Sequence, residues 1–308
     1  MKLRTIFLQI LALVFALNKA QAQIAISNTA EIGKIKLGTA FFAMKDPASP
    51  KAAEYIDAIK KNWTLSKVEC IKYTDVEKNI APNNFFVTIG ANMATSNASS
   101  VAETNFKLEF WTTNGKFVYD PKKRKHFNPE DKIVVASIDL FPDFTTQDNP
   151  SSLYKMDYDA AGHLKNWSAS ILGNYIQQVV ALLDKAEARE AKTTFFNGKS
   201  FPQTLYIPEY VLTKFSKNSD DESKKYDAKE ITDGVGLSCK FLTIGELNQK
   251  IAEPEAFYYL LFIKTNTARY VTVTHSQTGE IIYSAYSNSS ANFKAADLKD
   301  IQKAFQKK

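Results

Sequence analysis

Apolar residues recur at helical spacing in three separate stretches of the chain. The first follows Ser49-Pro50, where a serine can cap a helix and a proline fits its first position. The second occupies residues 167–189, and the third lies at the C-terminal end. Their apolar positions are Ala52, Tyr55, Ile56, Ile59 and Trp63, then Ile171, Tyr175, Val179, Leu182 and Ala186, then Leu298, Ile301 and Phe305. We expect an amphipathic helix at each stretch, and a fourth that starts at Pro208 and carries Val211, Leu212 and Phe215.

Two further segments share the pattern of a strand followed by Thr-x-x-Glu. They are SKVECIKYTDVE, residues 66–77, and VGLSCKFLTIGE, residues 235–246. At one fixed offset the matching pairs are Cys70 and Cys239, Thr74 and Thr243, and Glu77 and Glu246. Thr-x-x-Glu is the spacing of a capping box, in which the two side chains satisfy free backbone N–H groups at a helix start. We therefore expect a strand and a capped helix in both segments.

The match continues further along the chain. Pro82 and the predicted strand 85–87 correspond to Pro254 and strand 257–259. FKLEFWTTNGKFVYD, residues 106–120, then aligns without a gap on YVTVTHSQTGEIIYS, residues 270–284. The alignment places Gly115 on Gly279 and Tyr119 on Tyr283. Each block reads as two strands joined at Asn-Gly or Thr-Gly, a hairpin signal because glycine accepts the positive φ of the turn.

Three matches in the same order predict an internal duplication. We expect an α+β protein made of two tandem copies of a helix-strand-helix-strand-hairpin-helix domain, with mixed or antiparallel sheets and helices packed on one face. The first copy spans residues 23–192 and carries an insertion at 121–165, which includes an additional strand at 133–140. The second copy spans 193–308. Within it, the charged stretch 216–230 is expected to form a mobile loop.

Residues 1–22 have the three parts of a cleavable secretory signal peptide. Lys2 and Arg4 form a positive start, the run 6–17 is apolar apart from one glutamine, and Ala20-Gln21-Ala22 provides small residues for cleavage. The apolar run is shorter than the about 20 residues that cross a bilayer. We expect a periplasmic or secreted protein that is not lipid-anchored, because no cysteine follows the cleavage point; an uncleaved anchor helix is the alternative.

Removal of the signal changes the charge of the chain. The full sequence has 39 basic and 33 acidic residues, and without Lys2, Arg4 and Lys19 the net charge falls to +3. This balance does not suggest nucleic acid, whose binding needs a concentrated basic surface. No later segment is long and apolar enough to predict a transmembrane helix.

The order of elements, closing in Thr278-Gly279-Glu280-Ile281, resembles the α/β domain of bacterial envelope proteins related to the curli secretion pore subunit and to lipoprotein activators of cell-wall synthases. In that family the hairpin commonly ends in Thr-Gly-Glu and a hydrophobic residue. The resemblance implies an envelope adaptor or assembly factor without catalysis. This chain departs from the family in having no lipid-attachment cysteine. Its composition is also similar to that of exported proteins of the Bacteroidetes.

Cys70 and Cys239 are the candidates for thiol chemistry. Both fall on the apolar face of a predicted strand, which indicates small core residues at equivalent positions. A disulfide between the copies is an alternative, although equivalent residues of separate cores would lie too far apart to bond. A catalytic thiol needs a lowered pKa and a nearby base, and no histidine is near either cysteine in sequence.

Three other patterns have simpler structural interpretations. The basic run 122–126 could contact an acidic partner, but it is typical of a solvated loop. Residues 157–162, DYDAAG, lack the third ligand and the distant glutamate of a calcium loop. Residues 233–236, DGVG, lack the third glycine of a dinucleotide loop, and a strand follows where a helix is needed. We therefore predict no catalytic, cofactor or metal-binding residues.

The sequence favours a non-enzymatic binding or assembly protein of the cell envelope, with an envelope protein as partner and loop-rich residues 121–165 as the region to test. Deleting that region is expected to leave a folded protein without its partner. Two alternatives remain. One is a binder of a small molecule or glycan in the cleft between the copies, suggested by the 12% aromatic content. The other is a hydrolase whose site is assembled from residues distant in sequence.

Overall fold

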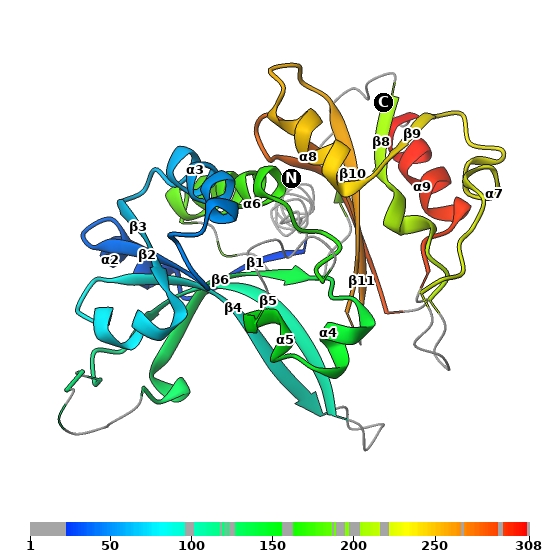
Figure 1. The fold of residues 1–308 in the computed structure, drawn as a ribbon. Helices are drawn as coiled ribbons and strands as arrows, with labels where there is room; N and C mark the ends of the chain where they lie inside the picture. Colours follow the sequence, from blue (N-terminus) through cyan, green and yellow to red (C-terminus); the bar gives the residue numbers. More distant parts are fainter. Residues whose placement is uncertain are drawn as a thin grey trace, which may run out of the picture.

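The computed structural model describes residues 23–95, 102–117, 119, 120, 122, 127–155, 163–186, 188, 195, 196, 204–215, 222–265, 268–288 and 292–306. These residues form two six-stranded mixed sheets that stand side by side, with helices packed against both (Figure 1). The predicted α+β class is confirmed.

The first sheet has the strand order β1-β6-β5-β4-β2-β3. Its strands are β1 (Ile24–Ile26), β2 (Thr39–Met44), β3 (Lys67–Lys72), β4 (Phe85–Thr95), β5 (Ala102–Thr113) and β6 (Lys132–Leu140). Strand β2 pairs in parallel with both β3 and β4, and the remaining neighbours are antiparallel.

The second sheet repeats this arrangement strand for strand. Its order is β7-β12-β11-β10-β8-β9. The strands are β7 (Phe195–Phe196), β8 (Thr204–Pro208), β9 (Ser238–Leu242), β10 (Tyr258–Lys264), β11 (Arg269–His275) and β12 (Ile281–Ser287). Strand β8 takes the place of β2, because it pairs in parallel with β9 and β10. The shared order and direction are what two tandem copies require.

The predicted amphipathic helices form at three of the four places. They are α3 (Ala53–Asn62), α6 (Ala169–Asp184) and α9 (Ala295–Gln306). The fourth is wrong: after Pro208 the chain makes one 3-10 turn, η6 (Glu209–Leu212), which buries Val211. The other α-helices are α2 (Ile32–Ile35), α4 (Phe144–Asp148), α5 (Ser152–Lys155), α7 (Ala228–Thr232) and α8 (Ile244–Ala252). The other 3-10 turns are η1 (Thr29–Glu31), η2 (Pro50–Ala52), η3 (Tyr73–Asp75), η4 (Glu77–Asn79) and η5 (Pro129–Asp131).

The two predicted hairpins have different outcomes. In the second copy β11 and β12 pair directly across the turn that contains Gly279. In the first copy the described residues between Gly115 and β6 form no strand, and β5 pairs instead with β6. Strand β6 is thus the counterpart of β12 rather than an additional strand. The extra residues of the first copy begin inside the hairpin connection, where Phe117 packs against Phe86 and Trp111 on the outer face of the sheet.

The two predicted capping boxes also differ. Thr243 and Glu246 form one at the start of α8. Thr74 lies in η3 and caps nothing, and the Glu77 side chain instead accepts a hydrogen bond from the backbone N–H of Phe127 at 2.9 Å. In the first copy the connection between the strands is also three residues shorter, which leaves room for two 3-10 turns but not for a helix like α8.

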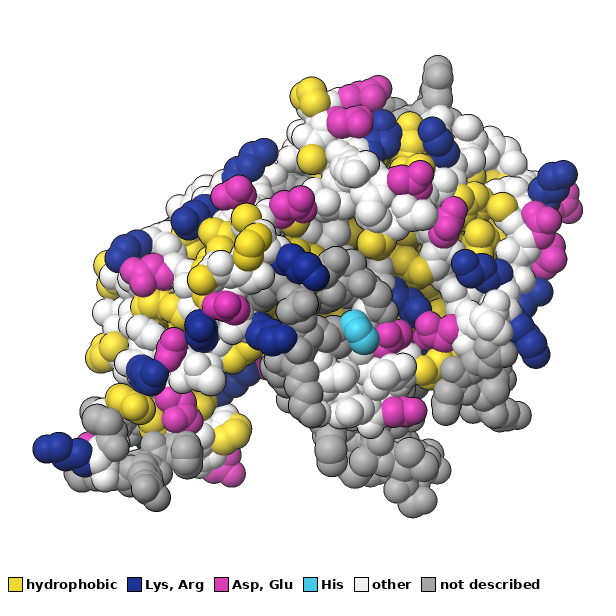
Figure 2. All heavy atoms as spheres, in the orientation of Figure 1, with side chains coloured by type: hydrophobic (Ala, Val, Ile, Leu, Met, Phe, Trp, Pro, Cys, Tyr) yellow, Lys and Arg dark blue, Asp and Glu magenta, His cyan; other side chains and the backbone are white. Residues whose placement is uncertain are grey.

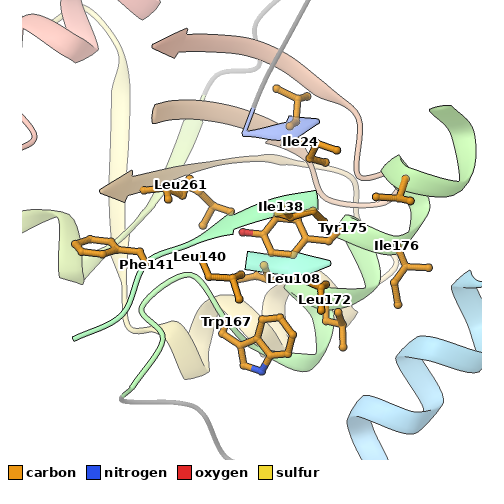
Figure 3. Packing of buried hydrophobic residues seen from close by; sticks show 14 of the residues in the cluster. Ile24, Leu108, Ile138, Leu140, Phe141, Trp167, Leu172, Tyr175, Ile176 and Leu261 are labelled. Atoms are coloured by element: carbon orange, nitrogen blue, oxygen red, sulfur yellow. The ribbon is translucent and has the colours of Figure 1, made fainter. Parts of the chain in front are cut away.

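Helix α6 belongs to the core of both copies. Eleven of its 16 residues are buried, which indicates a helix enclosed on most sides. Figure 3 shows the Tyr175 ring of α6 beside Ile138 of the first sheet and pointing toward Leu261 of the second, and all three belong to the same buried cluster. Most buried apolar residues of the two copies accordingly form one continuous cluster, and a smaller, separate cluster lies around Phe86 and Trp111 of the first sheet.

The second sheet carries helices on both faces, whereas the sequence predicted helices on one face of each sheet. Side chains alternate across β10, so that Tyr259 reaches α6 while Phe262 packs against Phe293, just before α9. Helices α7 and α9 lie on the side of the second sheet that faces away from α6 (Figure 1). The described fold therefore runs from the first sheet through α6 to the second sheet and then to α9.

Region 121–165 is not a separable insertion. It contains β6, which lies between β1 and β5, and whose residues Val135, Ala136 and Ile138 are fully buried. The expectation that the chain folds without this region is therefore wrong, since the deletion removes a strand from inside the sheet. The charged stretch 216–230 is not wholly a loop either, because α7 begins at Ala228 and Glu222 pairs with Lys165 at 2.5 Å.

Candidate functional site

A groove lies between the two copies, on the side of the molecule where α3, α6 and α8 come together. In Figure 1 the blue helix α3 and the gold helix α8 stand on either side of the green helix α6. Two adjoining hollows of about 460 and 330 Å³ occupy this space, and both are lined by Glu54, Ala169 and Asn248. We call the two together the inter-copy groove. Its volume is that of typical ligand sites, which often lie between domains.

The α3 wall is positioned by close packing on α6. Gly173 of α6 faces α3, and a side chain at that position would approach the Asn62 amide nitrogen to 2.9 Å. Trp167, just before α6, stacks on Tyr55 of α3 with ring centres 6.2 Å apart. The buried side of α3 is thus fixed against α6, while Glu54 and Asp57 remain exposed along the groove.

The α8 wall is fixed at its start by the capping box. The Thr243 hydroxyl accepts from the backbone N–H of Glu246, and the Glu246 carboxylate accepts from the backbone N–H of Thr243. The carboxylate accepts from the backbone N–H and from the hydroxyl of Thr243, and these two hydrogen bonds lower the pKa of Glu246. Gly245 follows the cap and lines the groove, and a Cβ there would meet no atom within 4 Å. The groove is therefore open at this point.

The two copies are joined across the floor of the groove by hydrogen bonds between α6 and α8. The side-chain oxygen of Asn248 accepts from the backbone N–H of Ser170, and the Ser170 hydroxyl donates to the backbone oxygen of Asn248, both at 2.9 Å. The N–H of Ser170 lies in the first turn of α6, where no helical partner exists. Asn248 thus caps a helix of the other copy, together with Ser168, which accepts from Ile171.

The turn of the second hairpin closes the floor. Asn174 donates to the backbone oxygen of Ser276 at 2.8 Å, and Gln178 donates to that of Gly279 at 2.7 Å. Gly279 has φ +65°, and a side chain there would overlap the backbone of Asn174. Gly115, its counterpart, has φ +78° with open space around it. The Thr-Gly-Glu turn thus has a specific contact in the second copy, where it seats against α6.

Several amide groups of the groove have no partner among the described residues. The Asn62 amide nitrogen donates to the backbone oxygen of Ala58, which leaves its oxygen. The side-chain oxygen of Asn248 accepts from Ser170, which leaves its side-chain nitrogen unpaired. The side-chain nitrogen of Gln277 donates to two backbone oxygens, which leaves its side-chain oxygen unpaired. The Gln249 side chain makes no hydrogen bond within the described part of the chain and lines the groove from α8. The α3 wall and the turn at Gln277 therefore present acceptors, and the α8 wall presents both donors and an acceptor.

The charged groups around the groove are of both signs. Two acidic and two basic residues line it from α3 and from η2, the 3-10 turn that precedes it: Glu54, Asp57, Lys51 and Lys61. Figure 2 shows the same mixture over this face of the molecule, where magenta and dark blue side chains alternate without a patch of one sign. The groove is thus polar with no strong net charge.

Folding brings one histidine close to both a carboxylate and a hydroxyl. His163 Nδ1 lies 3.3 Å from Asp143 and 3.1 Å from the Thr146 hydroxyl. Both contacts are made to the same ring nitrogen, whereas a catalytic triad needs the acid and the nucleophile on opposite nitrogens. No histidine lines the groove among the described residues, and Ser170 is already paired with Asn248. No group of three or more metal-ligating side chains is found in the described parts of the chain.

The predicted thiol positions are equivalent in the structure. Cys70 pairs with Phe42 across β3 and β2, and Cys239 with Leu205 across β9 and β8. Both are free and half-buried, and burial raises the pKa of each thiol to about 11. Both cysteines pack against the core as partly buried residues and not as fully buried core residues, and the thiols lack the lowered pKa of a nucleophile.

The remaining sequence candidates lie outside the groove or outside the described residues. Residues 123–126 of the basic run and the 157–162 motif fall outside the described residues. Asp233 ends α7, and the following glycines lie against Lys299 and Gln302 of α9, with strand β9 next as expected. The amides of the groove were not predicted, because they are scattered over three helices and a turn and share no motif.

No known protein family matches this sequence, and no curated protein or solved structure matches it either. Within the described residues, every helix is too short or too polar to span a bilayer.

Proposed function

We propose that this protein is an exported, non-enzymatic binding protein of the cell envelope, and that its ligand lies in the inter-copy groove. The observation that carries the proposal is the set of unpaired amide groups on both walls of the groove. An unpaired amide within a groove is a group that a ligand can satisfy, and a few convergent polar groups are what give a binding site its orientation and specificity.

The proposal replaces region 121–165 as the binding site. The groove is lined by α3, α6, α8 and the turn at Ser276, none of which belongs to that region. The aromatic content of the chain also no longer supports a glycan ligand, because the groove has no free aromatic ring among its described lining residues. Tyr55 is the aromatic residue among the described lining residues, and its ring is stacked on Trp167 with 6% of the residue exposed.

We propose a binding protein and not an enzyme because of where the two carboxylates of the groove lie. Glu54 and Asp57 are three residues apart on one face of α3, so both stand on the same wall. Acid–base pairs that act on a substrate have to reach it from suitable sides at hydrogen-bond distance. The opposite wall, α8, contributes amides and apolar groups to the groove.

Photo-crosslinking from inside the groove tests the binding site. A benzophenone amino acid replaces Gln249 on α8 or, as the matched control, Gln306 on α9, which is also an exposed helical glutamine but lies away from the groove. We expect irradiation of cells to give a defined adduct from position 249 and none from 306. Equal labelling at both positions, or no adduct at 249, would contradict the proposal.

The export half of the proposal rests on the sequence of residues 1–22. It predicts that the protein purified from its own cells has Gln23 as its first residue and is recovered from the envelope or the medium. Intact-mass measurement decides this, with the Ala20→Leu, Ala22→Leu double variant as the uncleaved control. A mature protein that retains residues 1–22 would exclude cleavage at this site.

A further inference from the structure

We propose that the ligand of the inter-copy groove is an extended segment of polypeptide, about six residues long, held through its main chain. This inference rests on the proposed function, since it names the class of ligand for that groove. Three properties of the groove support it: its pattern of hydrogen-bonding groups, its small side chains and its length.

The unpaired groups of the groove match those of a peptide main chain. Asn62 and Gln277 offer acceptor oxygens, Asn248 offers a donor N–H₂, and Gln249 offers both. An extended main chain presents N–H donors and C=O acceptors in alternation, with the same chemistry as a side-chain amide. Asparagine and glutamine side chains can therefore pair with successive peptide groups irrespective of the ligand's side chains.

Small side chains let a main chain approach the groove closely. Ala58, Ala169, Ala252 and Gly245 line it, and beyond the Cα of Gly245 there is open space. A sugar ring is more commonly held by packing its apolar face on an aromatic ring, and the ring of Tyr55 is occupied by Trp167. The lining therefore suits a peptide better than a glycan.

The length of the groove sets the length of the ligand. Its α3 wall runs from Pro50 to Asn62, thirteen residues of helix and initial 3-10 turn. At about 1.5 Å per residue this wall is about 20 Å long. An extended peptide advances about 3.3 Å per residue, so about six residues fill the groove. The two acidic and two basic groups on this wall leave no net charge to select a strongly charged segment.

The test begins with peptides selected on the full-length protein from a phage library of random heptamers. Synthetic copies are then measured by fluorescence anisotropy on the wild type and on Gly245→Trp, which fills the groove at its open point. Gly33→Trp is the matched control, because Gly33 is also the second residue of a helix, is exposed and has no atom within 4 Å of a Cβ. Thermal unfolding checks that both variants are folded.

We expect the selected peptides to bind the wild type and Gly33→Trp equally and to lose at least tenfold in affinity on Gly245→Trp. N-methylation of alternate peptide nitrogens, which removes main-chain donors, should also weaken binding at least tenfold. Peptides that tolerate every N-methylation would overturn main-chain recognition, and peptides that bind Gly245→Trp normally would overturn binding in this groove.

Maltotetraose and cellotetraose serve as the competing class of probe. If they bind the wild type and not Gly245→Trp while no peptide does, the peptide inference is wrong and the proposed function stands. If no peptide or oligosaccharide depends on Gly245 and position 249 gives no crosslink, the proposed function fails together with the inference.

Discussion

The side-chain oxygen of Asn248 accepts a hydrogen bond from the backbone N–H of Ser170 at 2.9 Å, so that a residue of the second copy caps the long helix of the first. Caps are usually supplied by the residue that precedes the helix, as Ser168 also does here. The second cap comes from 78 residues further along the chain. It holds α8 against α6 at the point where the groove's two hollows meet.

The first prediction concerns this cap. Asn248→Ala leaves the N–H of Ser170 without its partner and should lower the free energy of unfolding by about 1–2 kcal/mol. Asn248→Asp keeps an acceptor at the helix start and should stay within about 0.5 kcal/mol of the wild type. Urea unfolding followed by circular dichroism measures both. Equal losses in the two variants would show that the hydrogen bond contributes little.

The two turn glycines should respond differently to the same substitution. Gly115→Ala places a side chain at positive φ in open space and should cost about 1–2 kcal/mol. Gly279→Ala has the same strain and also drives a methyl group into the backbone of Asn174, which should add about 1–3 kcal/mol. Thermal unfolding of the two variants gives the comparison. A similar loss in both would mean that the turn does not seat tightly on α6.

Thr243 belongs to a capping box that forms, whereas its aligned partner Thr74 belongs to one that the sequence predicts but that does not form. Thr243→Ala removes the cap of α8 and should cost about 1 kcal/mol. Thr74→Ala alters an exposed residue that caps nothing and should cost less than about 0.5 kcal/mol. Chemical unfolding of the pair tests this, and a larger loss at Thr74 would indicate a helix start in the first copy.

These threonines show how far the sequence could predict the structure. The spacing of apolar residues predicted the three amphipathic helices, and the repeated segments predicted strands and the shared topology. Both signals are local, because they depend on residues close together in the sequence. The pairing of β5 with β6 could not be predicted, because it depends on tertiary packing. Phe117 and Phe127 cover Phe86 and Trp111 instead of continuing a hairpin. The sequence allowed a ligand in the cleft between the copies but did not predict the amides that line it, because these come together only when α8 docks on α6.

The cysteines predict a dependence of stability on pH. The folded protein keeps both thiols protonated up to a pKa of about 11, while the unfolded chain releases their protons from about pH 9. Because the unfolded state binds fewer protons in this interval, the free energy of unfolding should fall as pH rises from 9 to 11. The Cys70→Ala, Cys239→Ala double variant should show a smaller fall over the same range.

Alkylation gives an independent reading of the same thiols. With iodoacetamide, the rate for the native protein should keep rising with pH through 10, without levelling at pH 9. A plateau near pH 9 would indicate thiols with an ordinary pKa, and prior treatment with a reductant should change nothing because both cysteines are free.

Helix α6 has a consequence for how the molecule folds and how it can evolve. Its polar side chains hold the turn of the second copy, and its apolar side chains complete the interior of the first. Cutting the chain after residue 192 would leave the second half with an uncovered sheet face and the first with an exposed, largely apolar helix. The halves should therefore melt in a single transition and fail to fold when expressed apart. Although the two halves share one strand order, neither should be stable alone, and neither could be exchanged between proteins without the other.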